Sequence, residues 1–475
     1  MSNYHQNCLK LLFFTQLGPI RPGSIVEPLW ERIPFEIYER FWFFNVTNPR
    51  DVENFGAKPA LEEIGPFTYR LVFNKTDVIF NQNGTVSYRE KKTWHFDPSK
   101  SVANESEIIT TINGPVALAL AKFQNFSPAV RVLLTLAIER LNENYFIRKS
   151  IREILFEGYP SLLITLAPLL DPNISKFSHG RFAWFVGKND TDEGMYNMFT
   201  GTAKNGSILD QGLIDRFQNS TVLEYYKPGC NSLRDSSAGE LWPPTDSPSI
   251  KFFFPDLCRP VRMYYNHTYS SGEVYDIYAR RYVVDPRAFQ SPADNPENSC
   301  YSPTELPSGC FSLSDCKFGA PMVASLPHFL HGDPQLARDV TGLSPNISQH
   351  ELYIDVEPLL GLTVHLAGRM QVNVKIETAN FGKYKRVPKI VLPVFWQEMS
   401  VKISSNYGNL LWLVTRLPDF MSIIFAGLAA IIGTAMFSSG LYRFVRNRQF
   451  SDSDKQMAQL LITDDINDDN SNSIE

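Results

Sequence analysis

Histidines and carboxylates are the first candidates for chemistry in this chain, because they act as general acids, general bases and metal ligands. His328 and His331 lie three residues apart after Pro327, but no acid or cysteine completes a recognised metal motif, so we expect structural histidines. Asp355 and Glu357 lie two apart in a strand-like run and would share one face. We expect a structural hydrogen-bonded pair there rather than an acid/base dyad. No catalytic or nucleotide-binding motif is present, so we predict no enzyme, no metal site and no cofactor.

Cysteines supply a second kind of chemistry, the formation of disulfide bonds in an oxidising compartment. Five of the six cysteines fall within a short stretch: Cys230, Cys258, Cys300, Cys310 and Cys316. Two bonds should form and one cysteine should remain. Five cysteines allow 15 such arrangements, and spacing alone does not choose among them.

Acceptors for N-linked glycans, of the form N-x-S/T, occur at eleven positions, all of them before residue 419. Asn125 is a poor acceptor because Pro128 follows its triplet. The ten predicted glycan sites are Asn45, Asn74, Asn83, Asn104, Asn173, Asn189, Asn205, Asn219, Asn266 and Asn346. So one-sided a distribution indicates a glycosylated lumenal or extracellular region.

One segment, 420–442, has no charged residue and is long enough to cross a bilayer as a helix. Arg443, Arg446 and Arg448 follow it, and a basic flank marks the cytoplasmic side. The remaining tail, 443–475, carries seven carboxylates against four basic residues, so we predict an acidic cytoplasmic tail without regular structure. The tail contains a Leu460-Leu461 pair that is similar to an endocytic sorting signal, although Gln456 stands where an acid is usual.

The start of the chain does not provide the anchor that translocation of so large a domain requires. Within 1–23 only Leu9–Phe14 is apolar, and Lys10 interrupts it, so this stretch is too short to span a membrane. We expect 1–23 to be a truncated N-terminal anchor region, with an incomplete gene model as the favoured cause and an unusual signal or a shortened isoform as alternatives.

The elements between 24 and 419 are mainly strands, with one helical region. Residues 66–92 hold two β-rich runs around Asn83-Gly84, the strongest short hairpin signal, and 260–285 hold two more around Ser271-Gly272. Alternating apolar residues over 361–377 and the run 390–396 predict further strands. Helical spacing is found at 115–170, where Pro128 begins one helix and a Ser150–Glu153 capping box begins another that Gly158 ends. We predict one large α+β domain.

Composition and charge exclude several classes of protein. The chain has 475 residues, 45 Lys+Arg, 50 Asp+Glu and a net charge of −5. The mean hydropathy of −0.19 excludes a transporter with many spans. The near-neutral charge does not favour nucleic-acid binding, which a basic stripe would indicate.

Several runs resemble motifs of the class B scavenger receptor family, in the same order along the chain. They are 40–49 (RFWFFNVTNP), 65–70 (GPFTYR), 253–259 (FFPDLCR), 291–300, 325–329 (SLPHF) and 353–358 (YIDVEP). The resemblance covers about residues 24–445. It implies a large irregular antiparallel β-barrel with a helical bundle at the membrane-distal apex, a lipid-conducting tunnel through the barrel, and membrane spans at both chain ends.

The resemblance also implies a function. We expect a receptor that binds lipids, sterols or lipoproteins at its apex and transfers hydrophobic cargo through the tunnel to the membrane. The alternative is a lysosomal or endosomal trafficking or adhesion receptor that binds a protein partner at the apex. The expected location is the plasma membrane, with the lysosomal membrane as the alternative.

Two details of the site follow from the resemblance. The lysosomal type of cysteine pattern implies bonds between Cys258 and Cys316 and between Cys300 and Cys310, with Cys230 free. Apical cations that capture anionic ligands would be Arg148, Lys149 and Arg152. The alternative for these cations is a solvated helix face beside Glu153 and Glu157, and the absence of histidine from the segment argues against a histidine pH switch there.

Overall fold

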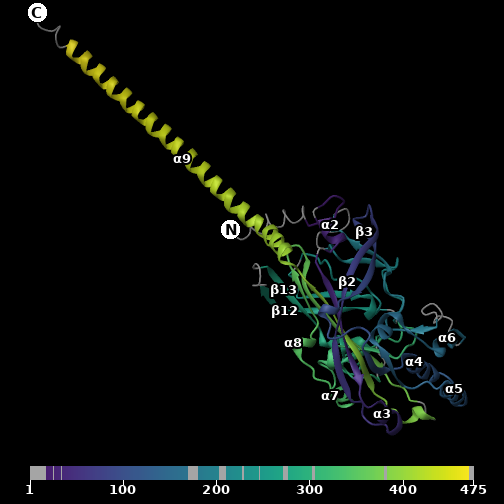
Figure 1. Cartoon of the computed structure of the whole chain (residues 1–475). Helices are drawn as coiled ribbons and strands as arrows, with labels where there is room; N and C mark the ends of the chain where they lie inside the picture. The colour runs from purple at the N-terminus through teal and green to yellow at the C-terminus, as the bar shows by residue number, and fades with distance from the viewer. Residues whose placement is uncertain are drawn as a thin grey trace, which may run out of the picture. The chain divides into compact units, whose positions relative to one another are not determined.

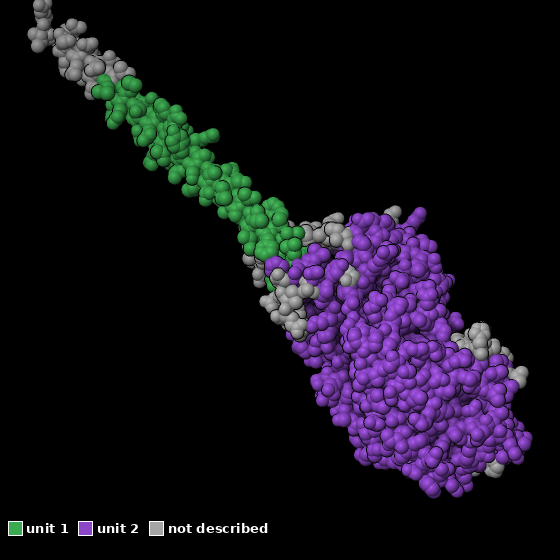
Figure 2. Space-filling model, in the orientation of Figure 1, with its two compact units in different colours: residues 1–13, 413–475 green, residues 14–412 purple. Residues whose placement is uncertain are grey.

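The computed structural model describes residues 18–24, 26–33, 35–169, 180–202, 210–226, 229–244, 246–270, 277–301, 305–378 and 382–469. These residues fall into two compact units, one within 14–412 and the other within 413–475 (Figure 2). The two units are described separately below.

The larger unit is built on one sheet that nearly closes into a barrel (Figure 1). Its strands are β1 (Ile37–Val46), β2 (Leu61–Phe80), β3 (Thr85–Phe96), β8 (Thr191–Phe199), β9 (Ile214–Phe217), β10 (Ser236–Ser237), β11 (Ser249–Phe254), β12 (Arg259–Ser270), β13 (Tyr278–Val284), β14 (Cys310–Ser312), β15 (Met322–Ser325), β16 (Tyr353–Glu357), β17 (Leu362–Lys375) and β18 (Val391–Lys402). The main path runs β10-β11-β12-β13-β16-β17-β18-β1-β2-β3-β8-β9, and β14 and β15 attach beside β17. A bridge between Leu213 and Ser237 joins the two ends of this path. The predicted α+β class with a large antiparallel barrel is therefore confirmed.

The strand predictions hold at both hairpins. Strands β2 and β3 pair antiparallel, with Phe80 opposite Val86, and Gly84 in the turn has φ +79°, which a glycine adopts without strain. Strands β12 and β13 also pair antiparallel, although their predicted turn at Ser271-Gly272 lies outside the described residues. The β-rich runs on either side of the turn residues were therefore sufficient to predict these strands.

The helical region contains more than helices. It comprises α4 (Gly114–Phe123), α5 (Pro128–Arg140), the strand β5 (Phe146–Ser150), a π-helical turn η2 (Glu153–Glu157), α6 (Leu162–Leu166) and η3 (Ala167–Leu169). Strand β5 pairs with β4 (Ile108–Ile112). The predicted capping box exists, since the Ser150 amide donates to Glu153 Oε2 and the Glu153 amide donates to Ser150 Oγ, but it begins one π turn and not a longer helix. Gly158 then ends that turn with φ +70°.

The remaining elements are short. They are α2 (Val26–Glu31), α3 (Pro49–Phe55), α7 (Pro334–Arg338), α8 (Ile347–His350), β6 (Tyr159–Pro160), β7 (Arg181–Phe182), η1 (Pro98–Lys100), η6 (Pro255–Leu257), η7 (Pro286–Phe289), η8 (Pro296–Asn298), η9 (Pro327–Phe329) and η10 (Lys383–Arg386). Figure 1 shows α3, α4 and α5 at the end of the barrel away from α2.

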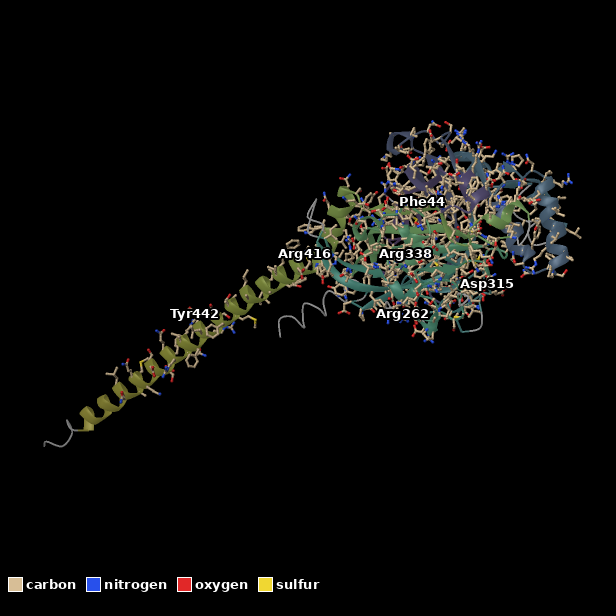
Figure 3. The ribbon with its side chains drawn as sticks, turned by 90° about the horizontal axis from the view of Figure 1, so that it is seen from below. Phe44, Arg262, Asp315, Arg338, Arg416 and Tyr442 are labelled. Atoms are coloured by element: carbon tan, nitrogen blue, oxygen red, sulfur yellow. A yellow bond between two sulfur atoms is a disulfide. The ribbon has the colours of Figure 1, made fainter. Side chains whose placement is uncertain are left out.

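Aromatic side chains pack on both faces of the sheet where β18, β1 and β2 lie side by side. Trp42 and Trp396 stack with ring centres 3.8 Å apart, and Phe41 packs edge-on against Phe395 at 6.0 Å. Phe44, labelled inside the larger unit in Figure 3, is 1% exposed. Because successive side chains of a strand point to opposite faces, the contact between Phe41 and Phe395 lies on one face of the sheet and the Trp42 stack lies on the other.

The smaller unit is the greater part of one long helix, α9 (Ser405–Asp469). The helix is long and apolar enough to cross a membrane, and its most apolar window has a mean hydropathy of 2.2 and no buried residue. Tyr442, labelled in Figure 3, is 66% exposed. The tail is helical up to Asp469 and not irregular as predicted, because no proline or glycine after Gly440 interrupts a helix already begun.

Candidate functional site

Helices α4, α5 and α6 form a helical cluster with an incompletely buried apolar surface. Helix α4 buries Val116, Leu120 and Phe123 against the rest of the larger unit. Helix α5, by contrast, buries only Thr135 and Ile138. A helix that buries so few of its apolar residues leaves the others to solvent or to a ligand.

A cavity of about 260 Å³ lies among these three helices. Its lining is almost wholly apolar: Pro115, Leu118, Ala119, Lys122, Phe123, Asn125, Phe126, Leu134, Ala137, Ile138, Leu141, Leu163, Ile164, Leu166 and Ala167. Such a lining buries an apolar ligand away from water and offers few hydrogen-bonding partners to polar groups of the ligand.

Helices α5 and α6, which contribute to the cavity lining, also carry exposed aliphatic side chains. We call them the aliphatic patch: Val130, Val132, Leu133, Leu136, Leu162 and Leu166. Leu133 is 66% exposed and Leu162 is 57% exposed. Several exposed apolar side chains on neighbouring helices are typical of a surface that binds protein, membrane or an apolar ligand.

The three predicted apical cations lie beside the helical cluster but differ in their availability. Arg148 and Lys149 are on strand β5, not on a helix, and Arg148 is exposed with no ion pair among the described residues. Lys149 Nζ lies 3.2 Å from Glu153 Oε1. Arg152 lies 2.6 Å from Glu105 Oε1. Two of the three charges are therefore already neutralised by carboxylates, as in the alternative of a solvated, ion-paired surface.

A buried ion cluster inside the barrel was missed by the sequence reasoning. Lys75 Nζ lies 2.6 Å from Glu240 Oε1 and 3.3 Å from Glu90 Oε2, and its side chain is fully buried. The ammonium also faces the rings of Trp30 and Tyr88 at 5.1 Å and 5.5 Å. Burial would lower the pKa of Lys75, but the two carboxylates keep that pKa above its ordinary value.

A second buried group of charges lies further along the same inner face. Lys92 Nζ is 3.2 Å from Glu193 Oε1. Trp94 Nε1 donates to Glu39 Oε2 at 2.5 Å. Burial raises the pKa of Glu39 to about 7, although the Trp94 bond favours the ionised form. The sequence did contain a sign of this cluster, because charged residues occupy positions of β3 that alternation assigns to the core.

The histidine and carboxylate candidates have structural partners. His328 is buried, its Nε2 lies 2.5 Å from Glu63 Oε2, and its ring stacks on His350 with centres 4.3 Å apart. Asp355 and Glu357 were predicted to form a hydrogen-bonded pair, but they do not bond to each other. Asp355 accepts two hydrogen bonds from one arginine, Arg281, each at 2.7 Å.

Glu357 accepts hydrogen bonds from the backbone amides of Leu359 and Leu360, at 3.0 Å and 2.8 Å. The two carboxylates separate because the turn after β16 supplies donors for one and the neighbouring strand β13 supplies a cation for the other. Among the described residues, no cluster of three His, Cys, Asp or Glu side chains is placed to hold a metal ion.

The disulfides correct one predicted pairing. Cys258 and Cys316 are bonded as expected, with Cα atoms 6.3 Å apart. Cys300, however, bonds to Cys230 and not to Cys310, with Cα atoms 6.2 Å apart. Cys310 on β14 is buried and free, and its thiol faces the carbonyl of Pro307 at 3.3 Å. The bond between Cys300 and Cys230 joins segments far apart in the chain.

Most predicted glycan acceptors in the described residues are exposed. They are Asn74, Asn83, Asn104, Asn189, Asn219, Asn266 and Asn346. Asn45 differs, because it is half-buried in β1, its Oδ1 accepts from the Thr110 amide at 2.9 Å and its Nδ2 donates to Glu62 at 3.3 Å. The acceptors Asn173 and Asn205 lie outside the described residues.

Comparison with known proteins identifies the relatives of this chain. A sequence model of the CD36 family matches residues 8–444. Scavenger receptor class B member 1 of the mouse is 30% identical over 422 residues, covering 87% of this chain and 81% of the relative. The bovine protein of the same name is 31% identical over 384 residues, covering 80% and 74%. Lysosome membrane protein 2 of the mouse is 29% identical over 435 residues, covering 86% and 87%.

Proposed function

The chain belongs to the CD36 family, and we propose that it is a receptor that binds lipids, sterols or lipoproteins at the helical cluster and passes hydrophobic cargo to the membrane. The family and its relatives make the chain a membrane protein of scavenger-receptor type, which agrees with the resemblance of its motifs. In the proposal, 24–419 lie outside the cytosol, 420–442 cross the membrane and 443–475 are cytoplasmic. The plasma membrane is the proposed location.

The observation that carries the proposal is the apolar cavity beside the aliphatic patch. An acyl chain or a sterol that leaves water for this cavity gains about 25 cal/mol for each Å² of apolar surface buried. No chemical step is required, because a membrane interior at the end of the path is a more favourable environment for the cargo than water. The path through the barrel is part of the proposal.

The cavity is tested by filling it. Ala137 lines the cavity and is exposed on α5, so Ala137→Trp places an indole in its mouth, whereas Ala137→Ser changes little volume. Lipids extracted from purified full-length protein are identified by mass spectrometry. We expect stoichiometric apolar lipid with the wild type and Ala137→Ser and a loss of at least about tenfold with Ala137→Trp, which equals about 1.4 kcal/mol of binding free energy. Equal lipid content in all three proteins would contradict the proposed site.

The charged part of the proposal now depends mainly on one residue. Arg148 is the predicted cation without an ion pair among the described residues, so Arg148→Glu should weaken capture of anionic lipoprotein particles by cells. Lys149→Glu is the matched control, because it makes the same change of charge at a residue whose ammonium is already paired with Glu153, so its effect on capture should be smaller. Normal surface expression is checked with both variants. Unchanged particle binding by Arg148→Glu would remove this residue from the proposed site.

A second candidate function is a trafficking or adhesion receptor in lysosomes or endosomes. The similarity to a protein named lysosome membrane protein 2 favours it, as does an aliphatic patch that could equally bind a protein. Leu133→Glu on the patch separates the two functions when lipid content and recovery of a cross-linked protein partner are both measured. Loss of the partner with no bound lipid in the wild type would favour this candidate over the first.

A further inference from the structure

A buried arginine lies in the cysteine-rich part of the larger unit. Arg259 begins β12 and is 2% exposed. Its guanidinium lies between two aromatic rings, 4.3 Å from the ring centre of Tyr301 and 4.4 Å from that of Phe311. One of its terminal NH groups donates to the carbonyl of Ala288. Among the described residues, no aspartate or glutamate forms an ion pair with it.

Two buried hydrogen-bonding atoms in this region have no partner within the part of the chain that the structure describes. They are Nε of Arg259 and the hydroxyl of Tyr226. Tyr226 packs edge-on against Tyr301 with ring centres 5.1 Å apart, so Tyr226 and Arg259 both contact the ring of Tyr301. Asp315, which has an electrostatic influence on Tyr226, is exposed and lies at the edge of the larger unit in Figure 3.

The surroundings hold both groups in place. The Asn231 side chain accepts from the Tyr226 amide at 2.9 Å and donates to its carbonyl. The Tyr301 hydroxyl donates to the Cys230 carbonyl at 2.8 Å, and Cys230 is bonded to Cys300. The donors therefore keep their positions, and a ligand would find them already oriented.

The charge balance indicates which ligand these groups lack. Burying an isolated cation is costly, and contacts with aromatic rings offset only part of that cost. Burial accordingly lowers the pKa of Arg259, which no neighbouring carboxylate restores. An arginine N–H and a phenol O–H are both donors, so a ligand that satisfies both must accept hydrogen bonds and carry negative charge.

We propose that Arg259 and Tyr226 bind a small monovalent anion, with Arg259 Nε–H and the Tyr226 hydroxyl as donors and the flanking rings as walls. The anion can be a free halide or the carboxylate group of an organic acid, because both are compact acceptors of single negative charge. This site is separate from the helical cluster and does not depend on the function proposed for it.

The test measures thermal unfolding of the full chain in detergent at constant ionic strength. Sodium methanesulfonate, which carries no carboxylate and is bulkier than formate, is replaced stepwise by sodium chloride or by sodium formate, and we expect the unfolding midpoint to rise and saturate with one or both anions. A response to chloride alone assigns a halide, and a response to formate assigns a carboxylate. Equal midpoints in all three salts would overturn the proposal.

Variants locate the effect without removing the buried charge. Tyr226→Phe deletes only the hydroxyl and should abolish the dependence on chloride or formate. Tyr145→Phe is the control, because the Tyr145 hydroxyl is also part of a buried residue but donates to the Glu377 carbonyl at 3.0 Å. It should lower the midpoint and retain the full anion dependence. Full dependence in Tyr226→Phe would also overturn the proposal.

Discussion

Single side chains in this protein show how burial changes ordinary chemistry. Lys75 and Lys92 are charged residues with fully or almost fully buried side chains, and each is retained because carboxylates lie within 3.3 Å. Removing one partner of such a group leaves an uncompensated buried charge, which typically costs about 3–5 kcal/mol. The interior of the barrel is therefore polar around Lys75 and Lys92. Any apolar cargo that passes through the barrel must avoid these charged groups.

Glu39 should make the free energy of unfolding depend on pH between mildly acidic and neutral conditions. Because its folded pKa of about 7 exceeds the ordinary 4.5, the folded state keeps a proton that the unfolded state has released. The free energy of unfolding therefore falls through this group as pH rises from about 4.5 to about 7. Glu39→Gln keeps an acceptor for Trp94 and removes the titration.

The measurement is urea unfolding of both proteins at about pH 5 and about pH 8. We expect the variant to gain stability relative to the wild type at the higher pH. Parallel pH profiles for the two proteins would show that Glu39 does not titrate in this window.

The cysteine pairing is checked by non-reducing peptide mapping. We expect peptides that link Cys230 to Cys300 and Cys258 to Cys316, and alkylation of Cys310 only after unfolding, because burial raises the pKa of its thiol to about 12. Cys230→Ser should lower the free energy of unfolding by about 2–5 kcal/mol. A recovered peptide linking Cys300 to Cys310 would contradict the structure.

At the scale of elements, alternation along β2 and β3 determines which side chains, including charged ones, point to the inner face of the sheet. The register sets Lys75 opposite Glu90 and Phe73 opposite Lys92, so both lysines and their partners share the inner face. A shift by one residue would turn the whole set outward. The helical cluster differs from these strands. In α5 the apolar residues have helical spacing, but only a small face of the helix is buried.

Closure of the barrel should be sensitive to one glycine. Gly212 precedes the Leu213–Ser237 bridge, has φ +78°, and an added Cβ would lie 2.2 Å from the Leu241 carbonyl oxygen. Gly212→Ala should therefore destabilise the protein by at least about 2 kcal/mol, measured by thermal unfolding. Gly187→Ala is the matched control, because Gly187 has φ +71° but nothing within 4 Å.

The control should cost about 1 kcal/mol, from its backbone conformation alone. Equal losses in the two variants would mean that the approach to Leu241 does not limit closure. A smaller loss at Gly212 than at Gly187 would have the same meaning.

At the scale of the whole molecule, glycan acceptors and the apolar helix agree with one topology. All acceptors precede the apolar part of α9, and the acceptors in the described residues are exposed on the larger unit with the exception of Asn45. If 24–419 lie outside the cytosol, as proposed, glycans can attach at these exposed acceptors, and only the acceptor at Asn45 is half-buried. The matching family relatives are consistent with a membrane location.

Mapping of glycopeptides from protein made in mammalian cells tests this topology. We expect glycans at Asn74 and Asn83, which are exposed, and none at Asn45, whose amide is bonded to Glu62. Asn74 is the matched comparison, because it lies on the neighbouring strand β2. A fully occupied Asn45 would show that β1 is accessible during synthesis, and a complete lack of glycans would contradict the proposed topology.

The sequence by itself determined the features that depend on neighbouring residues. The hairpin at Asn83-Gly84, the strands of 361–377, the apolar segment 420–442 and the family motifs were all predicted correctly or matched, because period and turn chemistry are local properties. Only the tertiary structure decided which groups meet across long separations. It paired Cys300 with Cys230, occupied Lys149 and Arg152 with carboxylates, and brought Lys75 to Glu240, because such contacts depend on distances in space that one chain's spacing does not contain.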